Sequence, residues 1–268
     1  MFQVGGEDKY ADKLDALFMQ RDYLRKHERA ALQYWKEPDW HNLRPVAICC
    51  DGNPHLSGVW NYFRNIISSE PQGGFPAGRS SFWMVVDDAT QAFLGVFGYT
   101  SFAQSWPHLE NLLGWEGRKD LRLEHRKHVQ FLARCLPSEP FGDLLGGKLL
   151  ALIATSSNML RLLELRYSLP VAGVAICTLH GKGSQYNRLE KEGVQFWGED
   201  DKGRGTFFCE TRAQGIDFLR GDAAELAGWS APTLAERIDH WRERYYRKRL
   251  KHRPPVFDSG QYMLGRFI

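Results

Sequence analysis

The chain has no apolar stretch that approaches the roughly 20 residues needed by a membrane-spanning helix. Its first residues are charged where a signal peptide has an apolar block, so we expect a cytoplasmic protein that does not enter a membrane. Cysteine is scarce: the chain has five, an odd number, and none of them forms a Cys-x-x-Cys pair. A disulfide framework, a zinc ribbon and a metal cofactor are therefore not expected.

Apolar and aromatic residues, in contrast, are plentiful. They make up 43% of the 268 residues and include nine Trp and sixteen Phe, which is enough for a sizeable core. The net charge is only +3, but the basic residues are concentrated near the C-terminus. We expect one globular domain with an extension at each end.

Apolar periodicity predicts an alternation of helices and strands. The expected elements are an amphipathic helix or two over Glu7–Trp35, a buried strand over Pro45–Asp51, a helix through Val59–Ile67, a hairpin of Ser81–Asp87 and Ala92–Phe102, a strand over Val129–Leu136 and a helix over Lys148–Tyr167. This order predicts a mixed α/β fold, of the α+β kind with one mixed sheet.

The stretch Val171–Gly198 predicts a buried strand, a glycine-rich turn, a short helix that carries Tyr186, and a second strand. Gly181 and Gly183 in the turn would let backbone N–H groups face a ligand. Tyr186 would lie at the mouth of the sheet, where a phenol can donate a proton to a leaving group. The alternative is that Tyr186 only packs and hydrogen-bonds at a helix edge.

The order of elements resembles the fold of the GCN5-related acetyltransferases (GNAT). In that fold, backbone amides where a strand turns into the long helix hold the pyrophosphate of acyl-CoA, and two splayed strands hold the acyl group. The resemblance places acetyl-CoA, or another acyl-CoA, at a turn formed by Leu144, Leu145, Gly146, Gly147 and Lys148. It also implies that Cys177 and Thr178 orient the thioester and that Tyr186 protonates the departing thiolate.

A closer resemblance covers roughly residues 50–210. It rests on Gly183-Ser184-Gln185-Tyr186, then Trp197-Gly198, then Gly203-Arg204-Gly205. These segments are similar to the DruA domain family of the Druantia anti-phage system and, more distantly, to the Mom-type proteins of phage Mu that modify adenine in DNA. The resemblance implies acyl transfer to an amine of a DNA base, in phage DNA hypermodification within a bacterial cytoplasm.

A base that deprotonates the amine would then be needed. His180 is the nearest candidate, because an imidazole titrates near neutrality. Asp51, at the end of the first strand, and His55 form a second candidate acid/base pair.

The segment Thr233–Arg253 predicts a helix that begins with an N-cap threonine and a capping-box glutamate, Glu236. Its apolar side can dock on the body, and its charges are mostly of one sign. We therefore expect it to contact DNA, either single-stranded or as a duplex with a base flipped out. The residues expected to contact phosphates are Arg244, Arg247, Lys248 and Lys251. The alternative is a solvated face.

The sequence thus predicts a helical N-terminal extension over residues 1–43, a GNAT-like core over 44–215, and a basic C-terminal helix and tail over 216–268. The expected activity is acetyl-CoA-dependent N-acyl transfer to DNA. Two alternatives stay open. One is a non-catalytic nucleic-acid-binding protein of a phage-defence or mobile-element system, and the other is an acetyltransferase for a small molecule or a protein.

Overall fold

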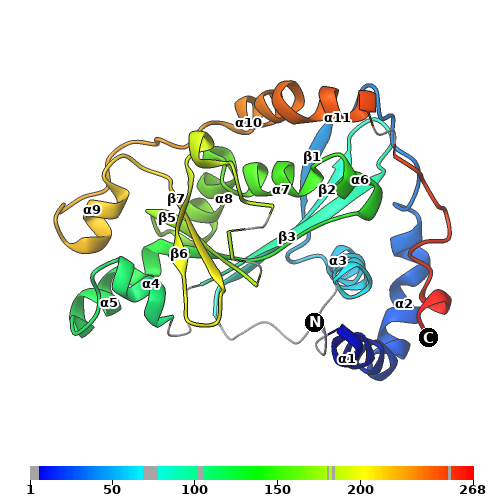
Figure 1. The fold of residues 1–268 in the computed structure, drawn as a ribbon, viewed down its shortest axis with the longest axis horizontal. Coiled ribbons are helices and arrows are strands. Elements are labelled where there is room, and N and C mark those ends of the chain that lie inside the picture. Colours follow the sequence, from blue (N-terminus) through cyan, green and yellow to red (C-terminus); the bar gives the residue numbers. More distant parts are fainter. Residues whose placement is uncertain (1–5, 69–77, 102–105, 180, 183–184, 253–254) are drawn as a thin grey trace, which may run out of the picture.

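The computed structural model describes residues 6–68, 78–101, 106–179, 181–182, 185–252 and 255–268. Within these residues, seven strands form one mixed sheet (Figure 1). In spatial order they are β1 (Pro45–Cys49), β2 (Ser80–Asp87), β3 (Phe93–Ser101), β4 (Val129–Pro137), β5 (Gly173–Thr178), β7 (Gly205–Glu210) and β6 (Val194–Glu199). Among the described pairs, only β4–β5 is parallel. The predicted α+β class is confirmed, and the arrangement is consistent with a GNAT-like fold.

The expected N-terminal helices are confirmed. They are α1 (Gly6–Met19) and α2 (Arg21–Leu32), and the helix after the first strand is α3 (Pro54–Ile67). The side chain of Asn53 caps α3 by accepting hydrogen bonds from two backbone N–H groups of its first turn. In Figure 1 these three helices lie together, and α3 packs against β2, β3 and β4.

Alternate side chains of the central strands point to opposite faces of the sheet and join separate apolar clusters. Met84 and Val96 pack with α2 and α3, whereas Val85 and Phe97 pack under α7 (Gly146–Ala154) and α8 (Ser157–Tyr167). A third cluster, which includes Phe208, covers the other half of the sheet. The elements on and around that cluster are α4 (Pro107–Leu112), α5 (Lys119–His125), η1 (Arg126–His128) and α9 (Gly215–Arg220).

The single helix predicted over Lys148–Tyr167 is wrong, because α7 and α8 are separated at Thr155 and Ser156. Thr155 Oγ1 donates to the carbonyl of Ala151 at 2.9 Å, and Ser156 Oγ donates to that of Ile153 at 2.7 Å. Such back-bonding competes with the helical ladder. Ser156 then takes an extended conformation and becomes the N-cap of α8. The turn before α7 contains a further short helix, α6 (Glu139–Asp143).

The short helix predicted around Tyr186 is also wrong for the residues that are described. Residues 185–188 form turns, and a 3₁₀-helix, η2 (Glu190–Glu192), follows them. Arg188 has a left-handed backbone, with φ of +64°, which a right-handed helix cannot contain.

The C-terminal helix is continuous but changes its winding. It comprises α10 (Leu234–Trp241), a π-helical turn η3 (Arg242–Tyr246) and α11 (Arg247–His252), and a last short turn is η4 (Leu264–Arg266). The predicted capping box between Thr233 and Glu236 is confirmed. α10 packs on α7, and α10 and α11 lie along the top of the molecule in Figure 1. In the part of the chain that the structure describes, no helix has the length and apolar character needed to cross a membrane.

Candidate functional site

β4 and β5 separate after a short parallel contact. They pair only where Val129–Phe131 faces Gly173–Ala175. Beyond this contact, β4 stays paired with β3 and β5 stays paired with β7. A splayed pair of strands therefore lies where the resemblance to the acetyltransferases puts the acyl group.

Residues 185–188, which follow β5 in the chain, lie against β4 and α7. Gln185 Nε2 donates to the carbonyl of Cys135 in β4 at 2.8 Å. Lys148 Nζ, from α7, donates to the carbonyl of Gln185 at 3.1 Å and to that of Asn187. These bonds fix the segment between β4 and α7. Gln185 thus satisfies a backbone group that β5 leaves unpaired.

Tyr186 is buried against the sheet, near β4 and β5 where these strands separate. It is 7% exposed, its ring packs on Phe207 with centroids 5.7 Å apart, and its hydroxyl hydrogen-bonds the side chain of Cys135. Burial raises the pKa of Tyr186 well above its usual value and raises that of Cys135 to about 12. Both groups stay protonated at neutral pH. A packed core tyrosine makes the same contacts, so the proton-donor role stays a prediction.

The turn expected to hold the CoA phosphates is covered by protein. A Cβ atom on Gly147 would lie 2.1 Å from Gln185 Oε1, so the Gln185 amide rests directly on the first turn of α7. On the other side, Trp241 Nε1 of α10 donates to the carbonyl of Leu145 at 3.1 Å. Leu145 is partly buried and the other expected residues are buried: Leu144, Gly146, Gly147 and Lys148. Because a pyrophosphate needs this space, these residues do not fit CoA in this structure.

Cys177 and Thr178 end β5. Cys177 lies opposite Thr206 of β7 and is half-buried, and burial raises the pKa of its thiol. Thr178 Oγ1 donates to the carbonyl of Gly181 at 2.7 Å and thereby fixes the turn after the strand. His180 lies outside the described residues, so its role as a base stays a prediction.

Asp51 lies in a different part of the sheet from Tyr186. It follows β1, and β2 and β3 separate that strand from β4. Its carboxylate accepts from Ser81 Oγ at 2.7 Å and from the backbone N–H of Phe82 at 3.0 Å, and it forms an ion pair with Arg166 at 2.5 Å. These partners hold the carboxylate in place. The structure therefore does not bring Asp51 and Tyr186 together.

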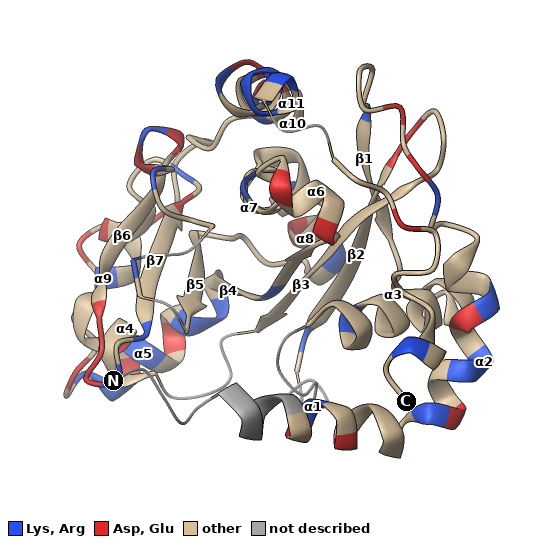
Figure 2. Cartoon of the chain, turned by 45° about the vertical axis from the view of Figure 1, so that its right-hand side comes forward, with Lys and Arg blue, Asp and Glu red and all other residues tan. Residues whose placement is uncertain are grey.

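The basic residues of the C-terminal helix fall into two groups. Arg244 forms an ion pair with the buried Glu192, with Nη1 2.8 Å from Oε1. Arg247, Lys248 and Lys251 of α11 are exposed, and the structure gives them no ion pair with any described residue. Figure 2 shows the blue of Lys and Arg on much of the ribbon of the C-terminal helix. Three of the four predicted residues are thus available to an external anion.

Two positioning residues were missed by the sequence reasoning. Gln185 was noted only as part of a motif, although it bridges β4 and α7. Glu192 docks the C-terminal helix by accepting a hydrogen bond from Arg244 Nη1, and His240 Nε2 lies 2.5 Å from the same carboxylate oxygen. No sequence pattern marks this contact, because Glu192 is one glutamate among several charged residues of a turn.

No group of three or more His, Cys, Asp or Glu side chains arranged to hold a metal ion occurs among the residues described. Comparison with protein-family models, curated proteins and solved structures found no match to the chain.

Proposed function

We propose that this protein binds nucleic acid through the exposed face of α11. The observation that carries the proposal is the composition of this helix end. α11 contains Arg247, Lys248, Arg249 and Lys251 and no acidic residue, and all four side chains are exposed. A compact group of cations of one sign, with no internal counter-ion, is the electrostatic footprint of a phosphate-binding surface.

The packing beneath α11 favours a nucleic-acid-binding surface over a face that contacts only solvent. Trp241 and Tyr246 are buried in the main cluster, and Leu250 packs against it. The ion pair of Arg244 with Glu192 adds a second attachment. Because α10 packs on α7 and α11 continues the same helix, the backbone that carries these cations is already fixed, and less conformational entropy would be lost on binding.

The direct test is the salt dependence of binding. Labelled duplex and single-stranded oligonucleotides are titrated with the protein, and fluorescence anisotropy is recorded between about 50 and 200 mM salt. We expect the logarithm of affinity to fall linearly with the logarithm of salt, by about 0.9 per phosphate contact for the duplex and about 0.7 for the single strand. Absence of binding at the lowest salt would refute the proposal.

A second candidate is an acyltransferase that uses an acyl-CoA and acts on an amine of a nucleic-acid base. The specific observation in its favour is the splay of β4 and β5, with Tyr186 buried near the point where they separate. Gln185 covers the turn that the cofactor phosphates would need, so binding would require this side chain to leave.

This second candidate makes its own calorimetric prediction. Gln185→Ala should bind acetyl-CoA at least about tenfold more tightly than the parent protein, because a buried hydrogen bond no longer has to be broken first. Gln33→Ala, at an exposed position, is the matched control and should bind as the parent does. If Gln185→Ala gives no heat with millimolar acetyl-CoA, the acyltransferase candidate is wrong.

A further inference from the structure

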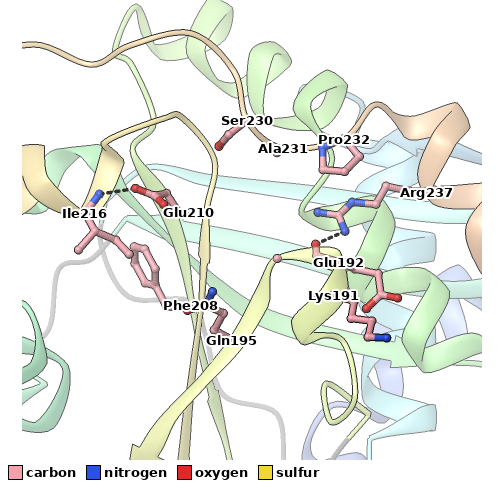
Figure 3. Close-up of a pocket in the computed structure, with 11 residues that line it drawn as sticks. Lys191, Glu192, Gln195, Phe208, Glu210, Ile216, Ser230, Ala231, Pro232 and Arg237 are labelled. Atoms are coloured by element: carbon pink, nitrogen blue, oxygen red, sulfur yellow. Dashed lines mark hydrogen bonds between the residues drawn. The ribbon is translucent and has the colours of Figure 1, made fainter.

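A cavity of about 270 Å³ lies between the β6–β7 hairpin and the segment that leads into α10 (Figure 3). Phe208 and Gln195 line it from the hairpin, Ser230 from the incoming segment, and Arg237 from α10. It is distinct from both the splay of β4 and β5 and the exposed face of α11. Its volume is near the lower limit for sites that hold small molecules.

Arg237 presents a buried positive charge at the wall of this cavity. Its side chain is 1% exposed. Nη1 donates to the backbone carbonyl of Glu192 and Nη2 to that of Thr155 at 3.4 Å, so both acceptors are neutral. Nε is buried and finds no hydrogen-bond partner in the described part of the chain. Buried guanidinium groups with unused donors are costly unless an anion meets them.

The carboxylate of Glu192, which also lines the cavity, is partly engaged by Arg244. Its Oε1 lies 2.8 Å from Arg244 Nη1 and 2.5 Å from His240 Nε2, whereas Oε2 is buried and has no hydrogen-bond partner among the described residues. Glu210, on the far side of the cavity, accepts from the backbone N–H of Ile216 at 2.8 Å. Among the charged residues that line the cavity, Arg237 and Lys191 match Glu192 and Glu210 in number, and Glu192 also pairs with Arg244 outside the cavity.

The remaining walls suit an organic molecule. Ser230 and Gln195 are exposed side chains that can donate hydrogen bonds, and Phe208 and Pro232 provide apolar surface. We propose that the cavity binds a small organic carboxylate, whose carboxyl group meets Arg237 and whose hydrocarbon part lies on Phe208. A guanidinium fork matches a carboxylate geometrically, and such charge-assisted hydrogen bonds are the stronger ones in proteins.

Such a ligand would join two separate parts of the fold. Arg237 belongs to α10, whereas Phe208 and Gln195 belong to β7 and β6. A bound carboxylate would therefore stabilise the docking of the C-terminal helix and raise the melting temperature of the protein in a concentration-dependent way.

The experiment titrates the full chain with acetate, butyrate and 3-phenylpropionate, using calorimetry and thermal unfolding. The matched neutral probe is 3-phenylpropan-1-ol, and inorganic phosphate is a separate arm. We expect at least one carboxylate to bind and to raise the melting temperature, and the alcohol to bind at least about tenfold more weakly than its acid. Binding of phosphate alone, or equal binding of acid and alcohol, would overturn the proposal.

Steric variants locate the site without removing Arg237, whose bonds to two carbonyls also support the fold. Ser230→Phe places a large side chain at an exposed wall of the cavity and should abolish carboxylate binding. Ser259→Phe, at an exposed position in the C-terminal tail, is the control and should bind as the parent does. Both variants keep every charge, so non-specific attraction of anions would survive in both. Unchanged binding by Ser230→Phe, or no binding of any carboxylate to the parent protein, refutes the site.

Discussion

The triple variant Arg247→Glu, Lys248→Glu, Lys251→Glu should bind duplex DNA about 10²–10³-fold more weakly than the parent protein at low salt. Each substitution removes a cation that has no ion-pair partner among the described residues and puts an anion in its place. The dependence of log affinity on log salt should become shallower by about 0.9 for every phosphate contact that is lost. Fluorescence anisotropy at several salt concentrations measures both quantities.

The control is a reversal of equal charge on another exposed helix face. Arg25→Glu, Lys26→Glu, Arg29→Glu changes α2 by the same number of charges, and these side chains are exposed as well. If both triple variants lose affinity equally, only the net charge of the protein matters and α11 is not the contact surface. Arg244 is left unchanged because its reversal would place an anion beside the buried Glu192.

Replacing Trp241 by alanine should lower the free energy of unfolding by about 3–5 kcal/mol, the usual loss when a buried aromatic side chain is truncated to alanine. Trp241 is fully buried, packs on Phe141 and Tyr246 with ring centroids 5.6 and 4.5 Å apart, and bonds the carbonyl of Leu145. The midpoint of urea unfolding, monitored by circular dichroism, measures the change.

Trp241→Phe is the matched variant, because it keeps an aromatic ring and removes the indole N–H. We expect it to cost only about 1–2 kcal/mol, since one hydrogen bond and part of the packing are lost. A loss below about 1 kcal/mol for Trp241→Ala would mean that α10 is not docked on α7 in solution, and the fixed surface proposed for nucleic acid would lose its support.

The packing of α10 brings the turn at Leu145 close to the basic helix, although the two are far apart in the sequence. The turn at Leu145 and the basic helix are adjacent, since Trp241 lies between them. Charge reversals on α11 are therefore not neutral controls for ligand binding at that turn. Calorimetry with acetyl-CoA should be interpreted together with the measured stability of each variant.

The sequence alone determined the elements whose signals are local. Apolar runs on either side of the turn at Asp88–Gln91 predicted β2 and β3, and the runs over Pro45–Asp51 and Val129–Leu136 predicted β1 and β4. The capping box at Thr233 and Glu236 fixed the start of α10. These predictions succeeded because a strand period or a cap depends on residues only a few positions apart.

Only the tertiary structure showed that the protein's own side chains cover the candidate site. Trp241 and Leu145 are 96 residues apart in the chain, and Gln185 and Cys135 are 50 apart, so no local pattern could pair them. The same holds for the turns around Tyr186, where bonds from Lys148 to two carbonyls fix a backbone that the sequence suggested was helical. Local propensity is weak beside such long-range packing, and it therefore could not show that the turn expected to face a cofactor faces the protein's own side chains.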